Sequence, residues 1–210
     1  MAHITYKNIT GDKVPSVTTI LGRFKDSGGL IRWSNAEGLK GNKYNDIMKK
    51  HQDIGTSLHE LAEMHILDHY YEYPQDETVR NCFEKFLLWW EESNFEVNWC
   101  EKSLISETFN FGGTADVLVN DDTIIDFKTS KSIYPDYIVQ GSAYRQMVEE
   151  VENKKINRFI LARFPKEGDT FEVKEYNREQ LDQAFEYFKT LRTAFDQDKQ
   201  LSKLTKEKKR

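Results

Sequence analysis

Residues Phe111–Lys131 read FGGTADVLVNDDTIIDFKTSK, and the rest of the chain is best interpreted outward from them. Two runs of apolar and β-branched residues, 114–119 and 123–127, flank the cluster Asn120-Asp121-Asp122. Asparagine and aspartate are typical of tight turns, so the stretch predicts an antiparallel hairpin.

Side chains alternate between the two faces of a strand, which sorts the polar residues of the hairpin. The set expected on one face of the first strand is Thr114, Asp116 and Leu118; on the second strand it is Ile124, Asp126 and Lys128, with Ile125 and Phe127 opposite.

Register decides whether the two aspartates meet. A three-residue loop places Val119 opposite Thr123, and Asp116 then lies opposite Asp126 with Cβ atoms roughly 5 Å apart. A two-residue loop would shift the register and separate them. Opposed carboxylates repel each other, and a divalent cation between them would remove that cost. Lys128 reaches the same place as a cation that can hold a water molecule or a phosphate oxygen.

Any one of these aspartates alone is best explained as an exposed charge. The combination D-x₉-D-x-K in an apolar hairpin favours a metal site instead. GGTAD followed by IIDFKTSK also resembles the PD-(D/E)XK nuclease superfamily, specifically its RecB-like exonuclease branch. Ala115 stands where that motif has proline, which leaves the carboxylate of Asp116 in place.

Residues 55–59, GTSLH, resemble a second motif of this branch, and the resemblance implies that His59 is a metal ligand. Ser57 and Glu60 have the spacing of a capping box, so we expect a helix that opens here and runs to about Tyr70. Without the resemblance, a lone histidine is more often structural. Glu107 precedes the hairpin, but register does not place it beside Asp116.

The segment from Pro135 to about Val151 predicts a helix with a proline in its first turn. Gln140 and Tyr144 on this helix resemble the fourth motif of the family, Q-x-x-x-Y, although a half-buried pair on a helix rim explains them equally well. The buried stripe is expected to consist of Val139, Ala143, Met147 and Val151.

The resemblance implies an α/β fold (an α+β sandwich) with a restriction-endonuclease-like core, in which helices flank a central mixed sheet. Residues 1–200 would form one nuclease domain, with an N-terminal helical elaboration over 1–50, and 201–210 would be a basic, frayed tail. A short N-terminal string, PSVTTIL at 15–21, resembles the mitochondrial genome maintenance exonuclease and phage exonucleases within this branch.

The site residues follow from the same resemblance. Mg²⁺ or Mn²⁺ would be held by His59, Asp116, Asp126 and the carbonyl of Phe127. The catalytic residues would be Asp116, Asp126 and Lys128, and the substrate-binding residues Gln140, Tyr144 and Lys131.

The amino-acid composition limits the kinds of partner and cellular compartment that the chain suits. The formal net charge of −5 is mild evidence against a nucleic-acid substrate, so any DNA footprint must be local. Two cysteines, Cys82 and Cys100, cannot build a four-cysteine cluster, and they suit a reducing compartment such as the cytoplasm. The sequence shows neither an apolar run of membrane-span length nor a signal-peptide core at its start.

The resemblances in the hairpin, in GTSLH and in Q-x-x-x-Y together imply a divalent-metal DNA exonuclease that acts on single strands or free ends. Phe24, Trp33 and Tyr44 precede the GTSLH motif and could stack bases in a passage for one strand, or could pack in the core. Two other functions stay open: a structure-selective or site-specific endonuclease with the same site, and a catalytically silent nucleic-acid-binding partner in recombination or replication.

Overall fold

The computed structural model describes residues 4–205, and within them five strands form one mixed sheet in the order β1-β2-β3-β4-β5. Neighbouring strands are antiparallel except β3 and β4, which are parallel and are joined through helix α5. A parallel pair requires such a crossover. The bounds are β1 Val97–Ser106, β2 Phe111–Val119, β3 Thr123–Lys128, β4 Arg158–Arg163 and β5 Glu172–Asn177.

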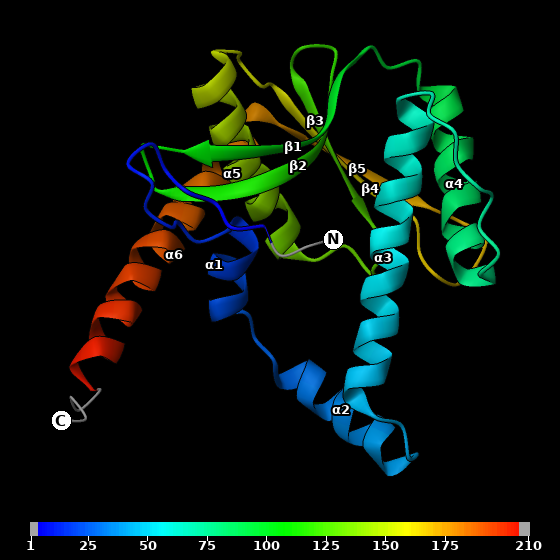
Figure 1. The fold of residues 1–210 in the computed structure, drawn as a ribbon, viewed down its shortest axis with the longest axis horizontal. Helices are drawn as coiled ribbons and strands as arrows, with labels where there is room; N and C mark the ends of the chain where they lie inside the picture. The colour runs from blue at the N-terminus through cyan, green and yellow to red at the C-terminus, as the bar shows by residue number, and fades with distance from the viewer. Residues whose placement is uncertain (1–3, 206–210) are drawn as a thin grey trace.

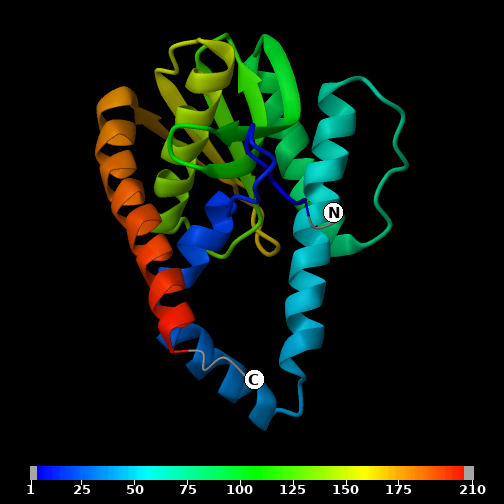
Figure 2. The ribbon, with the colours of Figure 1, turned by 60° about the vertical axis from the view of Figure 1, so that its left-hand side comes forward.

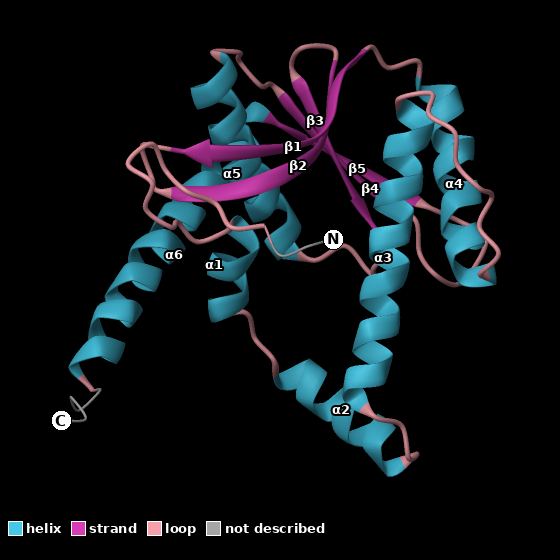
Figure 3. Ribbon diagram, in the orientation of Figure 1, coloured by secondary structure: helices cyan, strands magenta, loops and turns pink. Residues whose placement is uncertain are grey.

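Helices cover both faces of the sheet (Figures 1 and 2). Helices α5, α6 and α1 pack on one face, and α3 and α4 pack on the other. Helix α2 lies away from the sheet, between α1 and α3 (Figure 3). The helices are α1 Val17–Phe24, α2 Gly28–Leu39, α3 Tyr44–Ile66, α4 Glu77–Ser93, α5 Pro135–Glu152 and α6 Arg178–Leu204. The predicted fold class, a mixed sheet flanked by helices, is confirmed.

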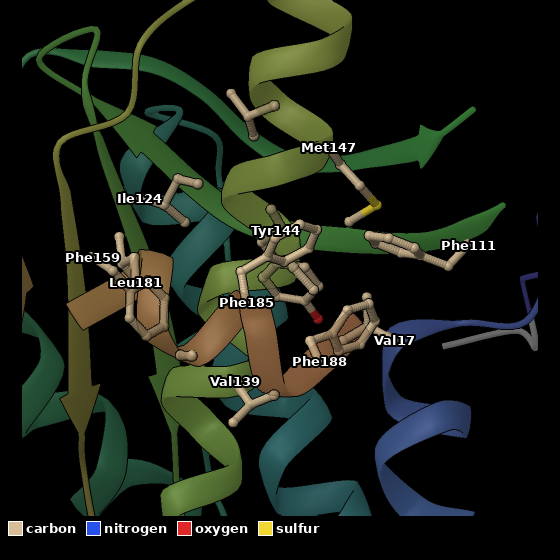
Figure 4. Close-up of a cluster of buried hydrophobic side chains, with 14 of the residues drawn as sticks. Val17, Phe111, Ile124, Val139, Tyr144, Met147, Phe159, Leu181, Phe185 and Phe188 are labelled. Carbon is tan, nitrogen blue, oxygen red and sulfur yellow. The ribbon is translucent and has the colours of Figure 1, made fainter. Parts of the chain in front are cut away.

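The larger core cluster fills the space between the sheet and helices α5 and α6 (Figure 4). Phe111 of β2 meets Phe188 of α6 with ring centroids 4.8 Å apart. Ile124 of β3 and Met147 of α5 are fully buried in the same cluster. Burial of these side chains fixes α5 against β2 and β3.

Aromatic rings dominate the core on the opposite face. Phe83 and Phe86 of α4 stack with centroids 5.8 Å apart, and Phe86 meets Phe127 of β3 edge-on at 5.4 Å. This packing fixes Phe127, and with it the backbone between Asp126 and Lys128.

The hairpin register is confirmed. Val119 lies opposite Thr123, and Val117 lies opposite Ile125. The three-residue connection includes Asn120 and Asp121 in the left-handed backbone region, with φ of 52° and 63°. Asparagine and aspartate tolerate this region better than other non-glycine residues, which explains why this turn type forms here.

The predicted alternation along β2 is wrong. Ala115 and Leu118, three positions apart, both pack in the cluster beneath α5 and α6, so the alternation breaks at Asp116. Opposite this point in β1, Glu101 has a φ of 45°. A residue in the left-handed region turns the strand locally, and the side chains beyond it change faces.

Helix α3 begins earlier than expected. It starts at Tyr44 and continues through Gly55 to Ile66, so the capping box predicted at Ser57 does not form. Ile54, Leu58 and Ala62 make one buried stripe along the helix. Burial of this stripe outweighs the roughly 1 kcal/mol that a glycine costs in a helix interior.

Two other boundaries differ from expectation. Helix α6 continues to Leu204, so the first residues of the predicted tail are helical; residues 206–210 lie outside the described part. Val151 is 53% exposed and does not belong to the buried stripe of α5. The helix ends one residue later at Glu152, where Asn153 takes a left-handed conformation.

Gly141 marks a close approach between α5 and β4, and its replacement tests the packing. An alanine Cβ there would lie 2.5 Å from the Phe159 ring. Overpacking of this kind costs roughly 1–3 kcal/mol, which exceeds the gain of about 1 kcal/mol from better helix propensity. Gly141→Ala should therefore lower the free energy of unfolding measured by chemical denaturation.

Gly22→Ala is the matched control. Gly22 is exposed on α1, and within the described chain nothing lies within 4 Å of its added Cβ. This substitution should stabilise the protein. An equal gain at Gly141 would contradict the packing of α5 on β4.

Candidate metal centre

The candidate site lies where two neighbouring strands separate. Pairing between β2 and β3 ends at Val117 and Ile125, and the strands then diverge (Figure 1). Asp116 and Asp126 are the first residues beyond this last pair. Asp116 Oδ2 accepts a hydrogen bond of 2.7 Å from the backbone N–H of Phe127. The carboxylate thus takes the place of a strand partner and is held between the strands.

Helix α3 brings His59 to the same point. Its Nε2 is 3.1 Å from the carbonyl oxygen of Phe127. Its Nδ1 is 3.2 Å from Glu101 Oε1 and 3.5 Å from Asp116 Oδ2. The ring therefore spans from the backbone of β3 to two carboxylates.

Glu101 of β1 is the site residue that sequence reasoning missed. Ligand atoms of His59, Glu101 and Asp116 all lie within 4.8 Å of one another. The left-handed backbone at Glu101 is rare for a non-glycine residue and tends to occur at functional sites. Nothing in the local sequence signals this backbone. Glu107, the carboxylate that sequence reasoning considered, instead accepts hydrogen bonds from the backbone N–H of Ile9.

Asp126 and Lys128 lie on the side of the sheet that faces α5. Asp126 is 1% exposed, and its Oδ2 forms an ion pair with the Lys128 ammonium. Lys128 is thus the partner of Oδ2, whereas among the described residues Asp126 Oδ1 has no hydrogen-bond partner. Asp126 thus stands next to the three-residue cluster without belonging to it.

Burial and neighbouring charges shift the pKa values of His59, Asp116 and Asp126. Burial by itself would lower the pKa of His59, but the charges of Asp116 and Glu101 outweigh it and raise the pKa to about 9. Burial raises the pKa of Asp126 to about 6, against the opposing charge of Lys128 and with the added charge of Asp116. Burial also raises the pKa of Asp116. The site therefore brings the carboxylates of Glu101, Asp116 and Asp126 together with two cationic groups, His59 and Lys128.

The donor set fits a hard divalent cation. Carboxylate oxygens are the ligands that Mg²⁺ and Mn²⁺ prefer, and a neutral imidazole is an acceptable addition. Asp126 Oδ1 is the strongest sign of fit, because it has no partner among the described residues and buried polar atoms normally have one. Ligation by His59 requires loss of its ring proton, so cation binding should release protons.

The structure places Gln140 and Tyr144 deep in the molecule. Both are buried, and Gln140 Nε2 donates to Tyr144 Oη at 2.6 Å. Burial, with added effects of Asp126 and Asp116, raises the pKa of the Tyr144 phenol well above its ordinary value. Tyr144 fits tightly over β2, where a Cβ at Gly113 would lie 2.8 Å from its ring. Tyr144 thus belongs to the core between α5 and the sheet, where Gln140 is hydrogen-bonded to it.

Of the two remaining predicted site residues, Phe127 lies at the cluster and Lys131 lies on an exposed loop. The Phe127 carbonyl accepts from His59, which leaves its second lone pair for a cation. Lys131 is exposed on the loop between β3 and α5, and its carbonyl accepts from Arg163 Nη1 at 3.2 Å. Among the helices within residues 4–205, none combines the length and apolar character needed to cross a bilayer.

Asp126→Asn should raise the melting temperature of the protein in EDTA at pH 8. The folded-state pKa of Asp126 is raised from its ordinary value of 3.8 to about 6. Ionisation over that interval therefore favours the unfolded state as pH rises. The asparagine amide does not ionise, so the variant keeps the folding stability that the wild-type protein loses when Asp126 ionises. The gain should shrink at pH 5, where folded Asp126 keeps its proton.

Asp121→Asn is the control for that measurement. Asp121 lies in the exposed hairpin turn with φ of 63°, which asparagine also adopts. Its ion pair with Lys154 is on the surface and contributes little. An equal rise in melting temperature for both variants, or a fall for Asp126→Asn, would contradict the electrostatic account.

No protein-family model and no curated protein matches this chain. Solved structures do match. LHK-Exo in complex with dAMP aligns with a TM-score of 0.53 at 14% identity, covering 90% of this chain and 89% of that one. The alkaline exonuclease LHK-Exo from Laribacter hongkongensis aligns at 0.46 with 13% identity and coverages of 90% and 94%. A putative exonuclease from Eubacterium rectale aligns at 0.44 with 14% identity and coverages of 85% and 73%. The first alignment confirms the expected fold, which this chain shares with LHK-Exo.

Proposed function

We propose that the chain is a divalent-metal-dependent DNA exonuclease that hydrolyses phosphodiester bonds from single-stranded ends. The observation that carries the proposal is the group of His59, Glu101 and Asp116 beside the buried ion pair of Asp126 and Lys128. The fold likeness supports it but cannot identify a site.

In this proposal Asp116, Asp126 and His59 hold Mg²⁺ or Mn²⁺, with the Phe127 carbonyl. Glu101 joins them, because its carboxylate lies beside His59 and Asp116. A bound divalent ion polarises the phosphate and makes a water molecule more nucleophilic. The protein fixes the ligand positions through the strand divergence and through the hydrogen bond from Phe127 N–H to Asp116.

Lys128 is assigned to the phosphate. Its side chain is 17% exposed and its ammonium lies beside Asp126. An ammonium held in a poorly hydrated position stabilises negative charge as it develops on the phosphate oxygens. It can also orient the attacking water.

Gln140 and Tyr144 are assigned to the support of Lys128 or of the DNA backbone. Tyr144 Oη accepts from Gln140, which leaves its O–H proton to donate. Lys131 is assigned to backbone phosphates, because it is exposed on the loop that follows Lys128.

The N-terminal helices support a requirement for a free end. In both ribbon views α1, α2 and α3 run out from the sheet and return to it (Figures 1 and 2). Phe24 is 40% exposed and Tyr44 is 37% exposed, and Trp33 meets Tyr44 with centroids 6.3 Å apart. None of these three is a buried core residue. Exposed aromatic rings can stack successive bases of a single strand.

The purified protein should degrade end-labelled single-stranded DNA with Mg²⁺ or Mn²⁺ and should stop when EDTA is added. Glu101→Gln and Asp116→Asn should each lower kcat at least ~100-fold, since each removes a carboxylate proposed to hold the ion. Glu107→Gln is the matched control and should retain activity, because Glu107 binds the backbone of Ile9 away from the cluster.

Activity that persists in EDTA would refute metal dependence. A wild-type protein that binds DNA but never cleaves it would favour the silent nucleic-acid-binding alternative. Equal losses for Glu101→Gln and Glu107→Gln would remove Glu101 from the site.

Linear single-stranded DNA should be degraded much faster than circular single-stranded DNA of matched length. In this proposal a single strand threads along the N-terminal helices, and threading needs a free end. The assay follows loss of both substrates in one tube with Mg²⁺. If the circular DNA is cut as fast as the linear DNA, the endonuclease hypothesis replaces the exonuclease proposal.

A further inference from the structure

Lys128 lies against an aromatic ring that none of the sequence motifs includes. Its ammonium is 5.2 Å from the ring centroid of Tyr137, within the ~6 Å range of a cation–π contact. Tyr137 is in the first turn of α5, one helical turn before Gln140. We propose that Tyr137 is a positioning residue that holds the Lys128 ammonium at the site, an inference that rests on the proposed nuclease function.

The other partner of Lys128 cannot serve this purpose alone. That partner is Asp126, which the proposed function also assigns to the divalent ion. A dication near Asp126 repels the ammonium and shares the same carboxylate charge. An aromatic face attracts a cation through its quadrupole and offers no ligand atom to a metal. Tyr137 can therefore hold Lys128 without competing for Asp126.

The surroundings fix the ring of Tyr137. Tyr134 meets it edge-on, with centroids 5.6 Å apart and an interplanar angle of 83°. Lys25, just beyond α1, lies 5.5 Å from the ring centroid of Tyr134 and forms a 2.8 Å ion pair with Asp136. Pro135 restricts the backbone at the start of the helix. A ring held this way can define where the ammonium rests.

The contact is also shielded from water. The Lys128 side chain is only 17% exposed, and cation–π attraction is stronger where the cation is poorly hydrated. Burial raises the pKa of the Tyr137 phenol, so the ring remains neutral. By comparison, the Lys25 side chain over Tyr134 is 55% exposed.

The alternative explanation is that the Tyr137 ring only packs against its neighbours. Changing the electron density of the ring while keeping its shape distinguishes packing from a cation–π contact. Tyr137 would be replaced in the full-length protein by phenylalanine and by phenylalanines carrying one, two or three ring fluorines. Fluorine changes the shape of the ring little but progressively weakens its negative face. Initial rates on a single-stranded oligonucleotide with Mg²⁺ give kcat and KM for each variant.

Tyr137→Phe should retain kcat within about twofold, because the ring is kept. Each fluorine should lower kcat in steps to about a tenfold total loss, while KM changes little. Tyr137→Leu should show a similar tenfold loss. The same fluorinated series at Tyr187, an exposed residue on α6, should leave kcat unchanged. A kcat that does not respond to fluorination at position 137 would overturn the proposal.

A second readout does not depend on cleavage. In protein labelled with ¹³C at the lysine ε-carbons, the Lys128 ε-protons should be shifted upfield by the ring current, with assignment by Lys128→Met. The shift should persist in Tyr137→Phe and disappear in Tyr137→Leu. An unchanged Lys128 resonance in Tyr137→Leu would overturn the contact. A wild-type protein without nuclease activity would instead refute the proposed function and leave this test intact.

Discussion

Beyond Val117 and Ile125, β2 and β3 no longer pair with each other, and this separation places two carboxylates inside the sheet. Ions that leave water without full compensation are costly in a protein interior. Part of the compensation comes from the chain itself, through the N–H of Phe127 on Asp116 and the ammonium of Lys128 beside Asp126. His59 and Glu101 lie beside the carboxylate of Asp116, where this compensation is incomplete.

The two faces of the sheet contribute differently to this point. From the α3 side, His59 and the turned backbone of Glu101 approach Asp116. From the α5 side, the ring of Tyr137 contacts the Lys128 ammonium, which pairs with Asp126. The aromatic core under α4 fixes Phe127. The backbone of Phe127 connects Asp126 to Lys128, and its N–H donates to Asp116. A packed fold thus holds acidic and basic groups at close range, which suits chemistry at a phosphate.

The sequence could predict the hairpin register because turn chemistry determined it. Asn120 and Asp121 adopt the left-handed conformations that a three-residue connection needs, and the pairing of Val119 with Thr123 followed. The direct opposition of Asp116 and Asp126 on one face did not follow, because pairing of the two strands ends at Val117 and Ile125. His59 could be singled out only through a resemblance, since a lone histidine on a helix carries no signal of its own.

Other features depended on tertiary structure. Glu101 joins the cluster through a left-handed backbone in mid-strand, and strand periodicity assumes that such residues do not occur. Local capping spacing suggested that α3 begins near Ser57, but the stripe of Ile54, Leu58 and Ala62 continues the helix upstream. Gln140 is buried rather than on a rim, because α5 approaches the sheet closely at Gly141 and Gly113. These outcomes reflect packing between distant segments, which local patterns do not encode.

The central claim is that the carboxylates at the strand divergence bind a divalent cation. Anomalous diffraction from crystals grown with Mn²⁺ tests it most directly. The account predicts an anomalous peak within bonding distance of Asp116, with Glu101 or His59 as a further ligand. Crystals soaked in millimolar Mn²⁺ that show no peak there, or a peak only at a surface site, would contradict it.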